Sequence, residues 1–220
     1  MTIKTSYYNV DFNNDIVLQE NSNEIENNIK ETLNNLPALN ILHNNNLLNA
    51  TIEQTTSFAK NKNFFLVLGT GGSNLGARAL INAFQGNKKN EIIFFDNIDP
   101  INFENSINKI DLTRTGFIII SKSGSTPETL SQFSCLIEIF DQKNCLDVLF
   151  NNSLVITEDQ DSPLAKIANL NKCNLMNHEK NIGGRYSIFS NVGMVPAIIA
   201  GLDVKKIHKG ALAELNKQSE

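Results

Sequence analysis

The sequence predicts an α/β protein in which a five-stranded parallel sheet carries helices on both faces, with further helices before it. Two observations lead to this prediction. From Asn61 onward, short apolar runs alternate with stretches long enough for crossover helices, and the apolar runs contain no regular polar alternation. Strands that are buried on both faces have this continuous apolar pattern, and strand–helix repetition is typical of a parallel sheet.

The first sixty residues are predicted to be helical. Four apolar residues recur at helical spacing before Pro37, namely Ile25, Ile29, Leu33 and Leu36. A proline stops such a helix. A second, asparagine-rich helical stretch is expected from about Leu39 to Lys60. We therefore expect an N-terminal helical segment over residues 1–60 and a sheet domain over residues 61–220.

The elements of the sheet domain follow one another in a regular order. The predicted strands are FFLVL (64–68), EIIFF (91–95), GFIII (116–120), SLVIT (153–157) and CNLM (173–176). The predicted crossover helices are NLGARALINAF (74–84), INFENSINKI (101–110), PETLSQFSCLIEIF (127–140) and SPLAKIANL (162–170). VPAIIAG (195–201) indicates a buried helix, and DVKKIHKGALAELNK (203–217) a final one. We assume the flavodoxin-like strand order 2-1-3-4-5.

The composition excludes several classes of protein. With a net charge of −4 and no Lys/Arg-rich run, the chain offers no general attraction to nucleic acid or to an anionic membrane. No apolar run approaches the ~20 residues of a bilayer span. The N-terminal MTIKTSYYNVDFNND lacks the apolar segment of a secretory signal. The lysine pair in NKKNE (87–91) is predicted to lie in a solvated loop.

The three cysteines are widely spaced and form no metal-ligand motif. They lie at positions 135, 145 and 173, so neither a zinc site nor a disulfide framework is expected. A reducing cytoplasm is the expected location. No metal and no cofactor are predicted.

Two loops rich in glycine and hydroxyl residues follow predicted strands. GTGGSNLG (69–76) comes after the first strand, and SKSGSTPET (121–129) after the third. In open α/β sheets, ligands bind beyond the carboxyl ends of the strands at a switch point. Strands 1 and 3 are neighbours in the assumed order, so both loops are expected to face one crevice.

The residues of these loops suit an anion. Ser125 or Thr126 is the predicted N-cap of a helix whose first residue is Pro127. A helix start presents unpaired N–H groups and a partial positive charge. Uncharged donors could come from the hydroxyl groups of Ser73, Ser121, Ser123 and Thr126. Close backbone approach is favoured at Gly71, Gly72 and Gly124. Lys122 could contribute its side chain or only its amide. The alternative is that each loop is a helix start without a ligand.

Other phosphate-binding motifs fit less well. A Walker A motif requires Gly-Lys where this sequence has Gly-Ala, so that motif is absent from the first loop. The dinucleotide fingerprint is matched at Gly69 and Gly71, but Asn74 stands at its third glycine. Asp96 could imitate the acidic residue that holds a ribose. An NAD-type domain therefore remains an alternative.

A third motif surrounds an arginine in NIGGRYSIFSNVGMVPAIIAG (181–201). Arg185 follows a Gly-Gly pair, which could permit an unusual backbone path that aims the guanidinium into a cleft. A permanently charged, planar donor there could stabilise a developing oxyanion. The alternative is a surface arginine in a turn.

These three motifs, in this order, resemble those of the glucose-6-phosphate isomerase family, and DNIDP (96–100) is also similar to a family stretch. The match extends over about residues 64–201. The resemblance implies a sugar-isomerase (SIS) domain, a three-layer αβα sandwich. It implies a sugar-phosphate site formed by Gly72, Ser73, Ser121, Lys122, Ser123, Gly124, Ser125 and Thr126. Arg185 would stabilise the enediolate in the interconversion of glucose 6-phosphate and fructose 6-phosphate, without metal or nucleotide.

The resemblance also identifies what this sequence lacks. In the family, the glutamate base, the ring-opening histidine and a lysine near the sugar lie in later parts of the chain. His43, His178 and His208 match no catalytic motif and are expected to be bystanders. We expect this chain to be the N-terminal part of such an enzyme, inactive alone, from a family whose full-length members form homodimers. The alternative is a non-catalytic SIS module that senses a sugar phosphate.

Overall fold

The computed structural model describes residues 22–84, 90–158 and 161–218. The chain separates into two compact units, residues 1–36 and 37–220, which are described separately below. The N-terminal MTIKTSYYNVDFNND and the lysine pair of NKKNE both lie outside the described residues.

The described part of the first unit is helix α1 (Ser22–Asn35), as predicted. Lys30 and Glu26 form an ion pair of 2.9 Å one turn apart on its surface. The helix ends before Pro37, because the residue that precedes a proline is disfavoured in the helical region.

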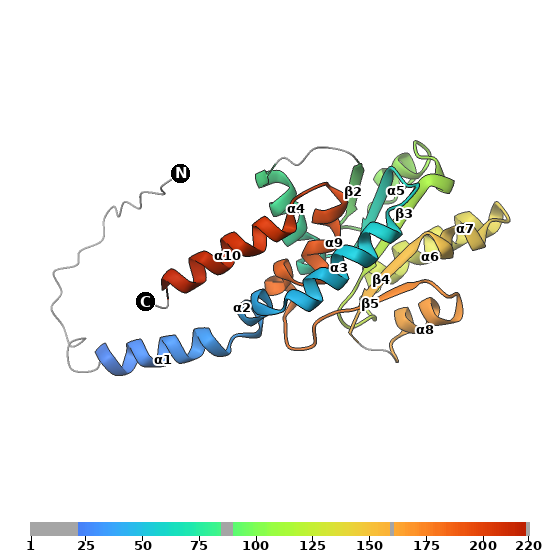
Figure 1. The fold of residues 1–220 in the computed structure, drawn as a ribbon. Helices are drawn as coiled ribbons and strands as arrows, with labels where there is room; N and C mark the ends of the chain where they lie inside the picture. The colour runs from blue at the N-terminus through green and yellow to red at the C-terminus, as the bar shows by residue number, and fades with distance from the viewer. Residues whose placement is uncertain (1–21, 85–89, 159–160, 219–220) are drawn as a thin grey trace, which may run out of the picture. The chain divides into compact units, whose positions relative to one another are not determined.

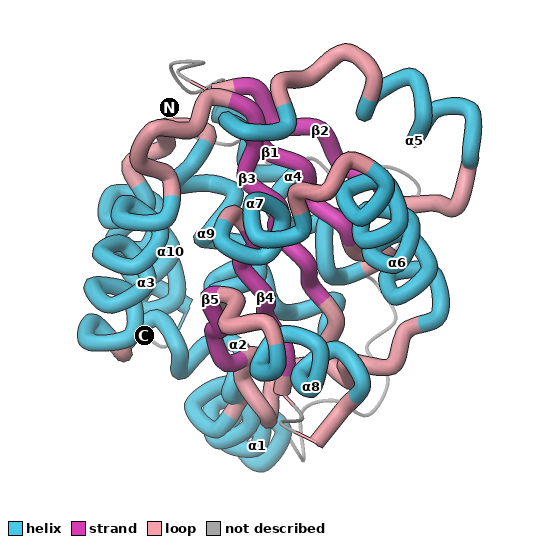
Figure 2. The backbone as a smooth tube through the Cα atoms, turned by 90° about the vertical axis from the view of Figure 1, so that its right-hand side faces the viewer, coloured by secondary structure: helices cyan, strands magenta, loops and turns pink. Residues whose placement is uncertain are grey.

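The second unit contains a five-stranded parallel sheet in the order β2-β1-β3-β4-β5, which confirms the assumed order. Figure 2 shows these strands side by side. The strands are β1 (Phe64–Leu68), β2 (Glu91–Phe95), β3 (Thr115–Ile120), β4 (Ser153–Thr157) and β5 (Asn174–Asn177). Because Leu68 is paired with Phe95 on one side and with Ile119 on the other, the carboxyl ends of the three strands are level.

Helices cover both faces of this sheet, so the predicted three-layer sandwich is confirmed (Figure 1). One layer consists of α5 (Pro100–Ile107), α6 (Pro127–Gln142), α7 (Leu146–Asn151) and α8 (Pro163–Leu170). The opposite layer consists of α3 (Asn45–Phe58), α4 (Gly72–Phe84), α9 (Asn191–Ile199) and α10 (Val204–Gln218).

Strand β3 shows why the apolar runs are continuous. Phe117 and Ile119 pack into the core with α6, whereas Ile118 and Ile120 pack into the core with α9. All four side chains are fully buried. Successive side chains point to opposite faces of a strand, so a sheet covered on both faces needs apolar residues at every position.

The helical prediction for residues 39–60 was only partly right. The structure has α2 (Pro37–Asn40), a 3₁₀ turn η1 (Ile41–His43) and α3 in place of one helix. Asn44 causes the break, because its side chain accepts a hydrogen bond from the Leu47 amide at 3.0 Å and so caps α3. The short helix α7 was not predicted at all.

Helix α3 belongs to the same compact unit as the sheet, because it packs on α9. Thr51 of α3 and Asn191 of α9 join the two helices through a side-chain hydrogen bond of 2.5 Å. The predicted division into a helical segment over residues 1–60 and a sheet domain over residues 61–220 stays a prediction.

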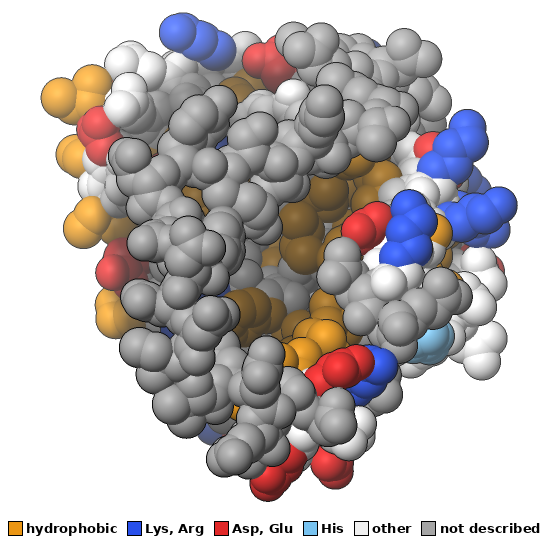
Figure 3. All heavy atoms as spheres, turned by 90° about the vertical axis from the view of Figure 1, so that its left-hand side faces the viewer, with side chains coloured by type: hydrophobic (Ala, Val, Ile, Leu, Met, Phe, Trp, Pro, Cys, Tyr) orange, Lys and Arg blue, Asp and Glu red, His pale blue; other side chains and the backbone are white. Residues whose placement is uncertain are grey.

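An apolar groove of about 590 Å³ runs beside α10. Its apolar lining comes from α4, from the residues around α9 and from α10, namely Leu80, Phe84, Phe189, Leu202, Ile207 and Ala211. Figure 3 shows several lysine and arginine side chains on the right of the face drawn.

Candidate functional site

The two glycine- and hydroxyl-rich loops leave the sheet side by side. The first loop follows β1 and the second follows β3, and these strands are paired along their length. A Cβ atom at Gly69 would lie 3.0 Å from the carbonyl oxygen of Ile120, so the first loop packs against the end of β3. The predicted adjacency of the loops is therefore confirmed, and the crevice between them stays a prediction.

The first loop is closed by a buried asparagine. Gly71 has φ +54°, a conformation that favours glycine, and α4 begins at the next residue. Ser73, half-buried, lies in the first turn of α4. The side-chain Nδ2 of Asn74 donates to the carbonyl oxygen of Gly69 at 2.5 Å. This bond explains why asparagine occupies the position where a dinucleotide fingerprint would have glycine.

The acidic residue after β2 is engaged by a neighbour. Arg78 of α4 donates to a carboxylate oxygen of Asp96 and forms an ion pair with it. A ribose would have to compete with this guanidinium for the carboxylate. The pairing therefore counts against the NAD-type alternative.

The second loop ends in a helix start whose hydroxyl groups bond to one another. Thr126 is the N-cap of α6 and Pro127 is its first residue, so one of the two predicted N-caps is confirmed. The Thr126 side chain makes no capping bond. Its Oγ1 lies 2.7 Å from Oγ of Ser121, which is buried at the end of β3. The first amides of α6 are therefore not capped by this side chain and suit an anion.

The outer part of this loop is exposed and sharply turned. Ser123 accepts hydrogen bonds from the amide and the hydroxyl of Ser125, at 3.3 and 3.1 Å. Both serines are exposed. Gly124 has φ +62°, and a Cβ there would lie 2.0 Å from Oγ of Ser162. Glycine is therefore required for both conformation and space.

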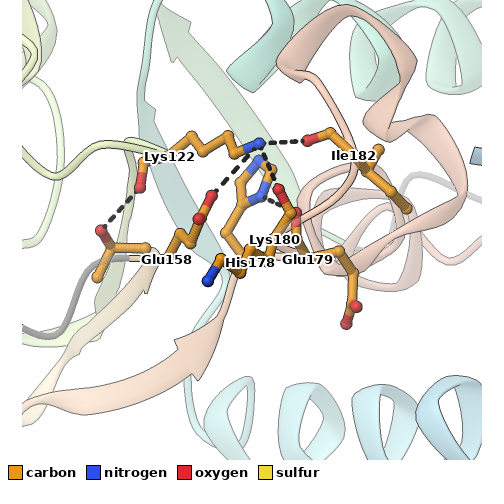
Figure 4. Close-up of polar contacts among 7 residues, drawn as sticks. Lys122, Glu158, His178, Glu179, Lys180 and Ile182 are labelled. Carbon is orange, nitrogen blue, oxygen red and sulfur yellow. Dashed lines mark hydrogen bonds and ion pairs between the residues drawn. The ribbon is translucent and has the colours of Figure 1, made fainter. Parts of the chain in front are cut away.

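The Lys122 side chain is directed away from the hydroxyl groups of its own loop. Its Nζ donates to the carbonyl oxygens of Lys180 at 2.7 Å and Ile182 at 3.0 Å. It also pairs with Glu158 at 3.3 Å (Figure 4). Of the two contributions left open by the sequence, the side chain is therefore engaged by other groups, and a role for the backbone amide stays a prediction.

The arginine motif packs directly on the first loop. A Cβ at Gly72 would lie 2.2 Å from the Gly184 carbonyl carbon and 2.6 Å from the Arg185 nitrogen. Arg185 is exposed in the 3₁₀ helix η3 (Gly184–Phe189), and its Cζ lies 5.9 Å from the Tyr186 ring centroid. Within the described part of the chain it forms no ion pair. The structure thus places all nine predicted residues at adjoining loops, while their roles stay predictions.

The sequence predicted that the Gly-Gly pair before Arg185 permits an unusual backbone path, and this prediction was wrong. Gly183 has φ −66° and ψ 149°, which is ordinary extended backbone, and Gly184 is not in the left-handed region. The residue that must be a glycine in this contact is Gly72, because it has no room for a side chain beside Gly184. A backbone contact between positions 112 residues apart leaves no periodic signal in the sequence.

Glu158 and His178 are the neighbours that sequence reasoning did not place at the site. His178 follows β5 and is 3% exposed, and its Nδ1 lies 3.1 Å from the Glu179 carbonyl oxygen. Burial lowers the pKa of His178 below 6.5. The hydrogen bond to Glu179 raises that pKa, the Lys122 ammonium lowers it, and the Glu158 carboxylate raises it.

The stability of the fold is expected to fall as the pH decreases from 7 to 5. Burial lowers the pKa of both His178 and His208 below 6.5, while a bond to the Phe189 backbone partly opposes this shift in His208. Stability from a depressed pKa is present above the unfolded value and is lost as the pH falls through the folded value. Each histidine can contribute at most about 1.4 kcal/mol per pH unit.

Guanidinium denaturation at pH 7, 6 and 5 measures this dependence. His178→Gln and His208→Gln should each make the free energy of unfolding less steeply dependent on pH, because glutamine does not titrate. If the free energy of unfolding depends on pH equally steeply in both variants and in the parent chain, the two histidines do not cause this dependence.

Known proteins resemble this chain over the residues that form the sheet and its loops. The family model described as "Phosphoglucose isomerase" matches residues 46–217. The chain is 37% identical to the glucose-6-phosphate isomerase of Campylobacter jejuni, with 74% of this chain and 40% of that protein covered. It is 34% identical to a probable glucose-6-phosphate isomerase of Methanococcus maripaludis, with 72% and 36% covered. The chain thus spans well under half the length of these two relatives.

A solved structure shares the fold. The crystal structure of a glucose-6-phosphate isomerase from Chlamydia trachomatis matches with a TM-score of 0.65 and 25% identity, over 77% of this chain and 32% of that one. None of the helices in residues 22–84, 90–158 and 161–218 has the length and apolar character needed to cross a membrane. In the same ranges, no three His, Cys, Asp or Glu side chains gather closely enough to hold a metal ion.

Proposed function

Because the chain belongs to the phosphoglucose isomerase family, we propose that it binds the phosphate group of a sugar phosphate where β1 and β3 give way to helices. In the complete protein, this site would serve the interconversion of glucose 6-phosphate and fructose 6-phosphate through a cis-enediol in the cytoplasm. The observation that carries the proposal is the meeting of three motifs: an uncapped helix start, a glycine loop and an arginine segment that packs on it.

The phosphate would be held by neutral donors. The amides at the start of α6 point their N–H groups outward from the helix, and its dipole favours an anion by ~0.3–1 kcal/mol, or up to ~2 kcal/mol when the site is partly buried. The proposed ligands are Gly72 and Ser73 of the first loop and residues 121–126 of the second. The hydroxyl groups of Ser123 and Ser125 are exposed, and among the described residues their hydrogen bonds stay within this loop, so both could donate to the anion.

Arg185 would stabilise the charge of the enediolate. A guanidinium stays protonated throughout the reaction, and the Gly72–Gly184 contact sets the backbone of Arg185 beside the first loop. The proton transfer itself needs a base, and no glutamate of this sequence stands in the family's base motif. Positioned acid–base groups contribute typically ~10²–10⁴-fold, so these 220 residues alone should turn over slowly or not at all.

The test replaces the two hydroxyl groups that bond to each other. Ser121→Ala or Thr126→Ala alone leaves a hydroxyl without its partner, whereas the double substitution removes both groups. We therefore expect the double variant to be nearly as stable as the parent chain. Its affinity for fructose 6-phosphate should fall at least ~10-fold, since hydrogen bonds to charged groups contribute about 1.5–3 kcal/mol.

Calorimetric titration measures the affinity, and thermal unfolding measures the stability. Ser131→Ala is the matched control, because Ser131 is an exposed hydroxyl residue farther along the same helix. Unchanged affinity in the double variant means that the loop is only a helix start. A rise in melting temperature with NAD(H) but not with the sugar phosphate favours the NAD-type alternative.

A further inference from the structure

The Lys122 side chain, in the loop after β3, reaches the turn after β5. Lys122 comes from the proposed phosphate loop, Glu158 follows β4, and the two carbonyl groups belong to the turn after β5 (Figure 4). The ammonium group therefore joins three strand ends. Fifty-eight residues separate Lys122 from Lys180, and sixty separate it from Ile182.

The Lys122 ammonium group has three partners in the protein, two carbonyl oxygens and one carboxylate. An ammonium group has three donors and no acceptor. The oxygens of Lys180, Ile182 and Glu158 lie 2.7, 3.0 and 3.3 Å from Nζ. Nζ thus donates hydrogen bonds to two carbonyl oxygens and pairs with one carboxylate, so a phosphate would have to compete with these partners for it.

The segment that Lys122 holds leads directly into the arginine motif. The amide of Ile182 bonds to the Glu179 carbonyl oxygen at 3.2 Å, which closes a turn over residues 179–182. The Ile182 side chain is 3% exposed, and Gly184, two residues later, rests on Gly72. The segment is thus fixed at Lys122 on one side and at Gly72 on the other, and Arg185 follows these contacts.

We propose that Lys122 is a positioning residue, whose ammonium group, oriented by Glu158, holds residues 180–182 against the phosphate loop and so sets the place of Arg185. Glu158 anchors Nζ from the end of β4 through the ion pair, and the two carbonyl oxygens accept hydrogen bonds from Nζ. We call the contacts of Nζ with Lys180, Ile182 and Glu158 the clamp. The consequence for Arg185 rests on the proposed function, whereas the clamp is a property of the unliganded chain.

Glu158 makes a paired design necessary. Lys122→Met alone would remove the clamp and also leave an unpaired carboxylate near the phosphate loop, which would repel an anion. The double variant Lys122→Met/Glu158→Gln removes the clamp without that charge. Glu158→Gln alone removes the anchor but leaves both carbonyl acceptors in place, so it should loosen residues 180–182 less than the double variant does.

Hydrogen exchange of the unliganded proteins tests the clamp. In the double variant, exchange of the amides of residues 180–187 should be at least about 10-fold faster than in the parent chain, because local opening becomes easier. The amides of β1 and β3 should keep their rates. Lys62→Met is the matched control, since Lys62 also donates to a backbone carbonyl, that of Phe58 at 2.8 Å, beside the opposite end of β1. It should leave residues 180–187 unchanged.

Titration with inorganic phosphate separates positioning from direct binding. A positioning role predicts that the double variant binds inorganic phosphate within about threefold of the parent chain. An affinity loss of 10-fold or more in that variant would show that Nζ is itself a phosphate ligand and would overturn the proposal. Unchanged exchange at residues 180–187 would overturn it as well. Failure of the parent chain to bind phosphate would refute the proposed function, while the exchange experiment would still decide the clamp.

Discussion

Replacing Gly72 by alanine is expected to lower the free energy of unfolding by about 1–3 kcal/mol and to weaken sugar-phosphate binding at the same time. The new Cβ would lie 2.2 Å from the carbonyl carbon of Gly184 and 2.3 Å from its oxygen. Both are backbone atoms, so no side-chain rotation can relieve the overlap. Either α4 or the arginine segment must move, and the two motifs would separate.

Chemical denaturation and titration with fructose 6-phosphate measure the two effects. Gly210→Ala is the matched control, because a Cβ at Gly210 meets nothing within 4 Å and the residue lies inside α10. Alanine there should raise stability by up to about 1 kcal/mol. Equal stability of Gly72→Ala and the parent chain would mean that the loop and the arginine segment do not touch.

The largest loss of stability is expected from Phe140→Ala, at about 3–5 kcal/mol. Phe140 of α6 is fully buried and packs edge-on against Phe117 of β3, with ring centroids 5.5 Å apart and an interplanar angle of 89°. This contact fixes α6 on the strand that precedes it. Since the proposed phosphate loop connects these two elements, loosening them should also weaken anion binding.

Thermal and chemical unfolding of the variant test this expectation. Phe84→Ala is the matched control, because the Phe84 side chain at the end of α4 is 58% exposed. Phe84→Ala should lower the free energy of unfolding by well under half as much as Phe140→Ala, since little apolar area is removed from the core. Similar losses in the two variants would contradict the assignment of Phe140 to the core.

The sheet could be predicted from the sequence because its physical signal is local. FFLVL and SLVIT coincide with β1 and β4, since strands that are covered on both faces must be apolar at every position. GFIII lacks only the first residue of β3, whereas CNLM is shifted by one residue from β5. The break at Asn44 was missed because an asparagine-rich stretch contains many residues that can cap a helix, and only packing selects one.

The loops of the candidate site could be predicted, but not the contacts between them. Gly124 and Thr126 stand out because turns and helix starts demand particular residue types nearby. The direction of the Lys122 side chain depends on Glu158 and on two carbonyl groups of the turn after β5, and carbonyl groups are common to all residues. The place of Arg185 likewise depends on Gly72, a contact that only the folded chain creates.

A crystal structure of the chain soaked with fructose 6-phosphate is the most direct test of the proposed site. The account predicts the phosphate at the start of α6, within hydrogen-bonding distance of backbone amides of residues 122–126 and of at least one loop hydroxyl group, with the sugar extending toward Arg185. A phosphate bound elsewhere, or a sugar that extends away from Arg185 while the loop between β3 and α6 stays empty, would contradict it.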